Sequence, residues 1–138
     1  MVVYSCAISY IAPMLHILLV FLGGGLGAAG RYLVGIAALR HLGPGFPYGT
    51  MIVNVVGSFL MGLLIGWLVR KGGSQEMRLF LATGLLGGFT TYSAFSLDVA
   101  NLWERGAVAH AFGYTLGTVV ACIIAIFAGL WLVRSLSA

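Results

Sequence analysis

The segment GGFTTYSAFS, residues 87–96, combines a glycine pair with five hydroxyl groups inside an otherwise apolar stretch. Glycine and threonine both weaken a helix, so the pairs Gly87-Gly88 and Thr90-Thr91 predict a break at this point. Non-helical backbone at membrane depth is tolerated only where it is buried or lines a cavity. A break frees backbone carbonyl oxygens, and such oxygens coordinate small cations such as Na⁺.

The second half of this segment offers two kinds of group that suit an anion. Tyr92 and Phe95 are three residues apart and share one helical face, and aromatic rings have electropositive edges. Ser93 and Ser96 form a parallel row of hydroxyl donors. The same spacing also fits a packed aromatic pair beside hydroxyls that bond back to their own helix, and both readings stay open.

Two further rows of polar residues lie in other apolar stretches. Asn54 follows Thr50 by four residues on one helical face, and its amide has two N–H donors. It suits either an interhelical hydrogen bond or an anion pathway. Tyr114, Thr118 and Cys122 also repeat every four residues, and they suit either packing or the lining of a pathway.

Away from their ends, the apolar stretches carry charge only at Arg31 and Asp98, where it is costly. Arg31 fits either a water-filled vestibule or a side chain that snorkels to the membrane interface. Asp98 is expected near the same membrane face, so the two residues are candidates for an ion pair.

Motifs for catalysis, metal ligation by side chains or nucleic-acid binding are missing from the sequence. Cys6 and Cys122 have no CxxC partner, and the three histidines form no HExxH group. No motif supports a triad of a serine with Asp98 and His110. The densest basic spot is Arg70-Lys71. We therefore expect neither an enzyme nor a nucleic-acid-binding protein.

The elements that position these groups are membrane helices. The chain is 61% hydrophobic and 7% charged, whereas soluble domains carry about 25% charged residues. Helices that cross the bilayer need about 20 apolar residues. Four such stretches are expected at about residues 14–39, 50–69, 77–103 and 108–132. We expect residues 1–138 to form a single all-α transmembrane domain, with the third helix broken near its middle and the first dozen residues as a loose extension.

The basic residues give only a weak preference for one orientation in the membrane. One side holds four of them (Arg70, Lys71, Arg78 and Arg134) and the other holds two (Arg40 and Arg105). Because the positive-inside rule depends on this difference, a nearly balanced chain can insert either way.

Small residues four positions apart predict close contacts between helices in lipid. They are Gly23 and Gly27, Gly62 and Gly66, and Gly113, Gly117 and Ala121. Four closely packed helices leave no obvious central hole. A transport path would then lie between subunits, most simply in a two-fold dimer.

Three motifs resemble, in order, those of the bacterial fluoride channels called Fluc or CrcB: GGGLGAAGRY, GTMIVNVVGSFLMG and TGLLGGFTTYSAFS. The resemblance covers about residues 15–132. It implies a multi-pass channel in the bacterial inner membrane that is specific for fluoride and lets this toxic anion leave the cytoplasm passively. It also implies an antiparallel, dual-topology homodimer with two anion pathways and one central, structural Na⁺.

The resemblance further implies roles for individual residues. The backbone carbonyls of Gly87 and Thr90 would bind Na⁺, and Arg31 would lie in a vestibule. The implied fluoride pathway consists of Asn54, Tyr92, Phe95, Ser93, Ser96, Thr50, Tyr114 and Thr118. The sequence departs from the family at Tyr92, where phenylalanine is usual, at Ala94, where threonine is common, and at Cys122, which is often serine.

Two other functions compete with this one. Small multidrug transporters are also four-helix, dual-topology dimers, but they need a glutamate within the first helix, and every acidic residue here lies after residue 75. A non-conducting structural subunit of the membrane is the other alternative, and it would tolerate Asn54→Ala.

Overall fold

The computed structural model describes residues 2–136, with side chains from residue 13 onward. This range contains only helices and the short connections between them, and no strand. The all-helical fold expected from the sequence is therefore confirmed. The helical segments are α1 (Val2–Leu42), α2 (Tyr48–Lys71), α3 (Gln75–Met77), η1 (Arg78–Leu86), α4 (Gly87–Phe89), α5 (Tyr92–Glu104) and α6 (Val108–Ser135).

Three of these helices are long and apolar enough to cross a membrane, over Pro13–Leu42, Tyr48–Lys71 and Val108–Ser135. The expectation of a loose extension before the first helix is wrong, because the backbone of α1 is helical from Val2. With 41 residues, α1 is about 61 Å long at 1.5 Å per residue. That is about twice the thickness of the hydrocarbon core of a bilayer.

The third expected crossing is a series of short segments rather than one α-helix. Its first part, η1, is a nine-residue π-helix, and α4 ends at Phe89. Thr90 and Thr91 then have extended backbone, with φ/ψ of −83°/158° and −154°/120°. The Thr91 hydroxyl accepts a hydrogen bond of 3.2 Å from the Ala94 N–H and so caps α5. The chain leaves the helical conformation for two residues and then resumes it.

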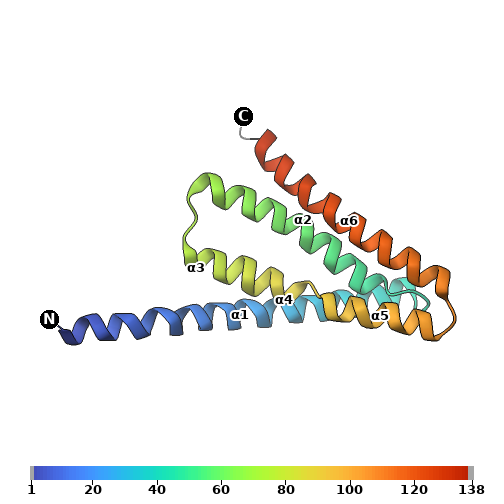
Figure 1. Ribbon diagram of the computed structural model, residues 1–138, viewed down its shortest axis with the longest axis horizontal. Helices are drawn as coiled ribbons and strands as arrows, with labels where there is room; N and C mark the ends of the chain where they lie inside the picture. The colour runs from blue at the N-terminus through green and yellow to red at the C-terminus, as the bar shows by residue number, and fades with distance from the viewer. Residues whose placement is uncertain (1, 137–138) are drawn as a thin grey trace.

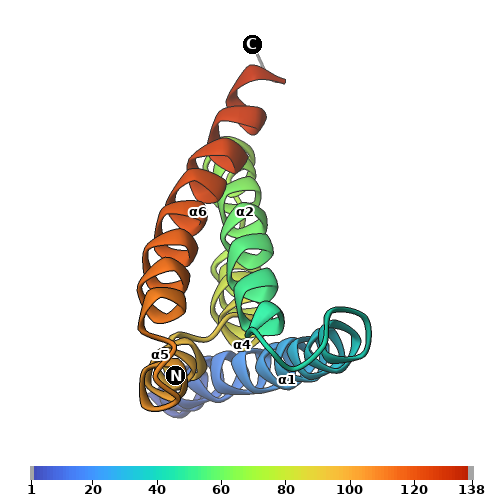
Figure 2. The ribbon, with the colours of Figure 1, turned by 90° about the vertical axis from the view of Figure 1, so that its right-hand side faces the viewer.

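The helices form two pairs. The helices of one pair run in the same direction, and the two pairs run in opposite directions. In Figure 1, α1 lies along η1 and α4, and α2 lies beside α6. Figure 2 views the same pairs from the end at which α1 and α5 finish. The start of α1, the α2–α3 connection and the end of α6 lie at one end of the molecule, and the other two connections lie at the opposite end. This is the arrangement expected of four consecutive crossings.

Glycines bring the helices of each pair into close contact. A Cβ atom on Gly27 of α1 would meet the Leu85 carbonyl and, at 2.7 Å, the Phe89 nitrogen. A Cβ atom on Gly62 of α2 would meet the Ile126 carbonyl of α6. By contrast, a Cβ atom on Gly113 or Gly117 would have no neighbour within 4 Å. The expectation that these two glycines serve close contacts is therefore not met within this protomer.

Candidate functional site

A pocket of about 350 Å³ opens where α2 and α6 meet the break before α5. We call it the break pocket. Its polar, aromatic and sulfur-containing lining residues are Asn54, Ser58, Met61, Thr90, Thr91, Tyr92, Phe95, Thr118 and Cys122, and the others are Gly57, Val119, Ile123 and Ile126. None of these residues carries a formal charge. Five residues assigned from the sequence thus come together here: Asn54, Thr90, Tyr92, Phe95 and Thr118.

The side chain of Asn54 holds the extended backbone at the break. Its Nδ2 donates to the Thr91 carbonyl at 2.9 Å, and its Oδ1 accepts from the Thr91 N–H at 2.7 Å. These two bonds satisfy backbone groups that have left the helical pattern. The sequence allowed either an interhelical hydrogen bond or an anion pathway for Asn54, and the hydrogen bond is present. A second hydrogen on Nδ2 is left over for another acceptor.

Two carbonyl groups at the break have left the regular helical hydrogen-bond pattern. Because the Thr91 N–H donates to Asn54, the Gly87 carbonyl lacks the N–H that it would meet in a continuous helix. The Thr90 carbonyl accepts a long hydrogen bond of 3.4 Å from Nη1 of Arg31. A carbonyl oxygen has two lone pairs, so Thr90 retains capacity for a further partner. At Gly87 and Thr90 the backbone oxygens thus lie outside the regular helical hydrogen-bond pattern.

The candidate ion pair of Arg31 with Asp98 is absent from the described part of the chain. Arg31 donates to the Thr90 carbonyl instead, and Asp98 accepts a hydrogen bond of 3.2 Å at Oδ2 from the Tyr114 hydroxyl. Arg31 is half-buried beside the break.

Three aromatic rings follow one another from the break pocket into the protein. The centroids of Tyr92 and Phe95 are 5.5 Å apart, and those of Phe95 and Tyr114 are 5.2 Å apart. Phe95 and Tyr114 are buried, with 5% and 1% exposure, whereas Tyr92 is 78% exposed. Tyr92 therefore forms the open edge of this row, and Tyr114 forms its buried end.

Thr118 presents an unused hydroxyl. Its side chain is only 3% exposed, and its Oγ1 is a buried side-chain atom without a hydrogen-bond partner in the described residues. Such an unsatisfied group costs about 1–3 kcal/mol. Thr118 lines the break pocket, although its Oγ1 atom is itself buried.

Ser93 and Ser96 do not reach the break pocket. The Ser93 and Thr91 hydroxyl oxygens are 3.3 Å apart, and the Ser96 hydroxyl donates to the Tyr92 carbonyl at 3.0 Å. The sequence left two interpretations of these serines open. Their contacts agree with the one in which the hydroxyls bond within their own segment. The sequence reasoning missed Ser58 and Met61, which follow Asn54 by four and seven residues and so share its helical face.

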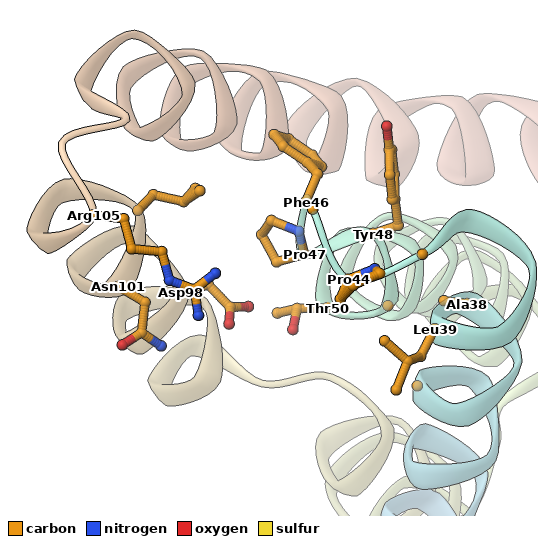
Figure 3. Close-up of a pocket in the computed structure, with 15 residues that line it drawn as sticks. Ala38, Leu39, Pro44, Phe46, Pro47, Tyr48, Thr50, Asp98, Asn101 and Arg105 are labelled. Atoms are coloured by element: carbon orange, nitrogen blue, oxygen red, sulfur yellow. The ribbon is translucent and has the colours of Figure 1, made fainter.

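A second pocket of about 340 Å³ lies beyond Tyr114, at the α1–α2 connection and the end of α5. We call it the loop pocket, and Figure 3 shows its lining. Its side chains include Phe46, Thr50, Asp98, Asn101 and Arg105, and Arg105 extends toward Asp98 (Figure 3). Thr50 is therefore in a different pocket from Asn54.

Tyr114 lies between the two pockets. Its ring contacts Phe95 of the break pocket and, edge-on at 5.4 Å, Phe46 of the loop pocket. Its hydroxyl donates to Asp98 of the loop pocket. The polar row expected on α6 is thus divided, because Tyr114 lies between the pockets while Thr118 and Cys122 line the break pocket.

Comparison with known proteins gives a consistent result. The family model described as CrcB-like protein, Camphor Resistance (CrcB), matches residues 18–130. A protein of Mesorhizobium japonicum, named fluoride-specific ion channel FluC, is 62% identical over 123 residues, which are 89% of this chain and 99% of that protein. Proteins with the same name from Chelativorans sp. and Agrobacterium fabrum are 59% and 54% identical, each over 124 residues, 89% of this chain and 99% of the relative.

The matched region contains both pockets, the break and most of the three long apolar helices. The relatives are named as ion channels and not as enzymes. This chain is a multi-pass bacterial membrane protein and belongs to the CrcB-like family.

Proposed function

We propose that this protein is a fluoride-specific ion channel through which fluoride leaves the cytoplasm passively, so that its toxicity is reduced. The names of relatives that are 54–62% identical support the proposal. The observation that carries it is the chemistry of the break pocket, which offers hydrogen-bond donors without formal charge.

Fluoride is a small, strongly hydrated anion, so a pathway must replace the water that it loses. The remaining N–H of Asn54 is a donor at the break pocket, and Thr118, which lines it, adds a buried hydroxyl that has no other partner in the described residues. The ring edges of Tyr92 and Phe95 add weaker positive potential. Since conduction requires binding that is weak enough for the ion to leave, neutral donors suit this task better than a lysine or an arginine.

The pathway that we propose runs from the loop pocket past Tyr114 to the break pocket. Thr50 and Arg105 are available at the loop pocket, and Tyr114 contacts a lining residue of each pocket. Ser93 and Ser96, which the family resemblance adds to the pathway, lie on exposed positions of α5. They would take part only if another subunit extended the pathway over them.

The functional unit that we propose is an antiparallel homodimer with two pathways. Tyr92 is 78% exposed at the open side of the break pocket, as expected for a ring that a second subunit covers. Gly113 and Gly117 present open helix surface on α6. The weak bias of four basic residues against two is compatible with insertion in both orientations.

A central Na⁺ is the cofactor that we propose for this dimer. The Gly87 and Thr90 carbonyls of both subunits would hold it, and the ion would supply positive charge that neutralises these oxygens and joins the subunits. We assign it a structural role. Arg31 donates a hydrogen bond to the Thr90 carbonyl and so orients this carbonyl.

The function can be tested with purified protein in liposomes. Fluoride efflux with retention of chloride is expected. Thr118→Val removes the unused hydroxyl at nearly constant volume, and we expect at least about a tenfold loss of fluoride flux, with unchanged or raised thermal stability. Thr115→Val is the matched control, because the Thr115 hydroxyl donates at 2.8 Å to the Ala111 carbonyl of its own helix and lies outside both pockets.

The competing functions predict other results. A structural subunit gives no anion flux in either orientation, and this result would end the channel proposal. Equal passage of fluoride and chloride would contradict the proposed specificity for fluoride. Exchange of protons for an organic cation would favour a multidrug transporter, although the described residues of α1 include no glutamate.

A further inference from the structure

One four-residue sequence occurs twice, at the ends of the two helices that form walls of the break pocket. The sequence WLVR stands at residues 67–70 of α2 and again at residues 131–134 of α6. Both helices are long and apolar enough to cross a membrane, and each ends one residue after this sequence. In each copy the tryptophan precedes the arginine by three residues, so the two side chains share a helical face.

The structure brings the two copies side by side. Nη2 of Arg70 donates a hydrogen bond of 3.2 Å to the backbone carbonyl of Arg134. A Cβ atom on Gly66 would lie 3.1 Å from Cβ of Val133, so the helices are in contact at this level. Figure 1 shows the ends of α2 and α6 at the same end of the molecule. We call this surface, residues 67–71 and 131–134, the WLVR pair.

The two arginines of the WLVR pair have hydrogen-bond donors to spare. Both side chains are exposed, and the carbonyl of Arg134 takes one of the five N–H donors of Arg70. Two guanidinium groups on neighbouring helix ends repel each other unless an anion lies between them. Because their N–H groups match the oxygen atoms of a phosphate, a phosphate group is the anion that this arrangement fits best.

Positive charge exceeds negative charge at this end of the molecule. Lys71 and Arg78 are exposed here as well, and Glu76 on α3 is the nearby acidic residue. The other two acidic residues of the chain, Asp98 and Glu104, are on α5, which ends at the opposite end of the molecule (Figure 1). A ligand at the WLVR pair is therefore favoured by a net negative charge.

A stripe of exposed apolar side chains leads from the WLVR pair along α6. Ile124, Phe127 and Trp131 share one helical face and are 63%, 64% and 67% exposed, and Arg134 continues the same face. On α2, Trp67 is 42% exposed. Tryptophan is enriched at the level of lipid headgroups, and each arginine lies about 4.5 Å further along its helix at 1.5 Å per residue. A ligand that matches both parts has an anionic head and a hydrocarbon chain.

We propose that the WLVR pair binds the headgroup of an anionic phospholipid. The guanidinium groups of Arg70 and Arg134 hold the phosphate, and an acyl chain follows the apolar stripe of α6. A zwitterionic phospholipid also has a phosphate, but its ammonium group is repelled by Lys71. The surface therefore selects a lipid with a net negative headgroup. This binding site does not depend on the proposed channel function.

Tryptophan fluorescence gives a direct test, because two of the three tryptophans belong to the WLVR pair. Trp103→Phe removes the third, which is on α5. This variant would be placed in phosphatidylcholine vesicles with rising fractions of brominated phosphatidylglycerol, or of brominated phosphatidylcholine in a parallel series. From the quenching, we expect an association constant at least about fivefold higher for the anionic lipid. This preference should decrease at high salt.

Variants of single arginines locate the preference. Arg134→Gln should lower it at least about threefold. Arg40→Gln is the matched control, because it also removes one exposed arginine from the last turn of a long apolar helix, α1, and should leave the preference unchanged. The double variant Arg70→Gln/Arg134→Gln should bind both lipids equally. An undiminished preference in the double variant, or an equal decrease in Arg40→Gln, would overturn the site.

Native mass spectrometry provides a second measurement on the protein with all its tryptophans. From micelles with equal amounts of phosphatidylglycerol and phosphatidylethanolamine, the wild-type chain should retain phosphatidylglycerol, and the double variant should not. Wild-type protein that retains neither lipid, or both equally, would contradict the proposal. Release of the lipid by millimolar inorganic phosphate would assign the arginines to a free anion and overturn the lipid site. Neither measurement uses fluoride flux, so failure of the channel function would leave both results unaffected.

Discussion

The carboxamide of Asn54 and the peptide groups of Thr91 exchange two hydrogen bonds, of 2.9 and 2.7 Å, between α2 and the break before α5. A single side chain therefore serves both the N–H and the C=O of a residue that has left the helix. This arrangement fixes the extended backbone to α2 and orients the remaining Asn54 hydrogen. It makes Asn54 a support of the break as well as a candidate donor for fluoride.

Asn54→Ala should destabilise the protein because it leaves both backbone groups of Thr91 without a partner. The expected cost is about 1–3 kcal/mol, together with a large loss of fluoride flux. Thermal unfolding in detergent and efflux from liposomes would measure the two effects. Ser58→Ala, one turn further along the same face of α2, is the control for stability and should have little effect on unfolding. Wild-type stability and flux in Asn54→Ala would show that the two bonds have no such role.

Tyr114→Phe should distinguish the contribution of the Tyr114 hydrogen bond from that of its ring contacts. The variant retains contact with Phe46 and Phe95 but removes the donor to Asp98. We expect a loss of about 1 kcal/mol in stability and a lower flux, because the Asp98 carboxylate at the loop pocket then lacks the Tyr114 donor. Asp98→Asn, which keeps an acceptor for the Tyr114 hydroxyl, should retain more of the stability. If both variants unfold like the wild type, the hydrogen bond has no structural importance.

Tyr92→Phe tests the departure from the usual family residue. The ring is 78% exposed in the protomer, so removal of its hydroxyl should change protomer stability by less than about 0.5 kcal/mol. We expect fluoride flux to persist in Tyr92→Phe and to fall strongly in Tyr92→Ala, which removes the ring edge. Comparable flux in the alanine variant would exclude the ring from the pathway.

Gly27→Ala should be much more harmful than Gly25→Ala, two residues away on the same helix. An added methyl group on Gly27 meets the backbone of Leu85 and Phe89, whereas one on Gly25 has no neighbour within 4 Å. Overpacking of this kind costs about 1–3 kcal/mol or more. Thermal unfolding of the two variants would measure the difference. Equal midpoints would contradict the close contact of α1 with η1 and α4.

Removal of Na⁺ tests the proposed cofactor. Protein transferred from Na⁺ to N-methylglucamine should form a less stable dimer, because a ligand that binds only the assembled state stabilises it by mass action. Dimer dissociation on dilution, followed by chemical cross-linking, is the measurement. Restoration by Na⁺ but not by N-methylglucamine is expected. An unchanged dimer in both media would mean that Gly87 and Thr90 hold no structural ion.

The parts of the site that follow helical spacing were predictable from the sequence. Asn54 on α2 and Thr118 on α6 belong to rows of polar residues four apart, and both line one pocket. Thr50 and Tyr114 belong to the same rows of polar residues, but each row extends beyond the break pocket. Thr50 lines the loop pocket, and Tyr114 lies between the two pockets. Periodicity defines a face of a helix and not the depth at which a cavity ends.

Other features depended on contacts between helices, which spacing does not contain. Ser93 and Ser96 follow a break, and the direction in which α5 resumes depends on the hydrogen bonds of Thr91 with Asn54 and Ala94. The π-helical form of η1 has no signal in its apolar sequence RLFLATGLL. Gly113 and Gly117 have the spacing of contact residues, yet their neighbours are absent from the protomer.

The π-helical geometry of η1 has a consequence for which changes the chain can tolerate. In an α-helix, one residue corresponds to a rotation of about 100° and a rise of 1.5 Å. A π-helical stretch holds more residues per turn, so its nine residues set the angle at which Thr90 and Thr91 arrive beside Asn54. Exchange of one apolar residue for another within η1 preserves that angle. Deletion or insertion of a single residue does not, so this segment is constrained in its length more strictly than in its composition.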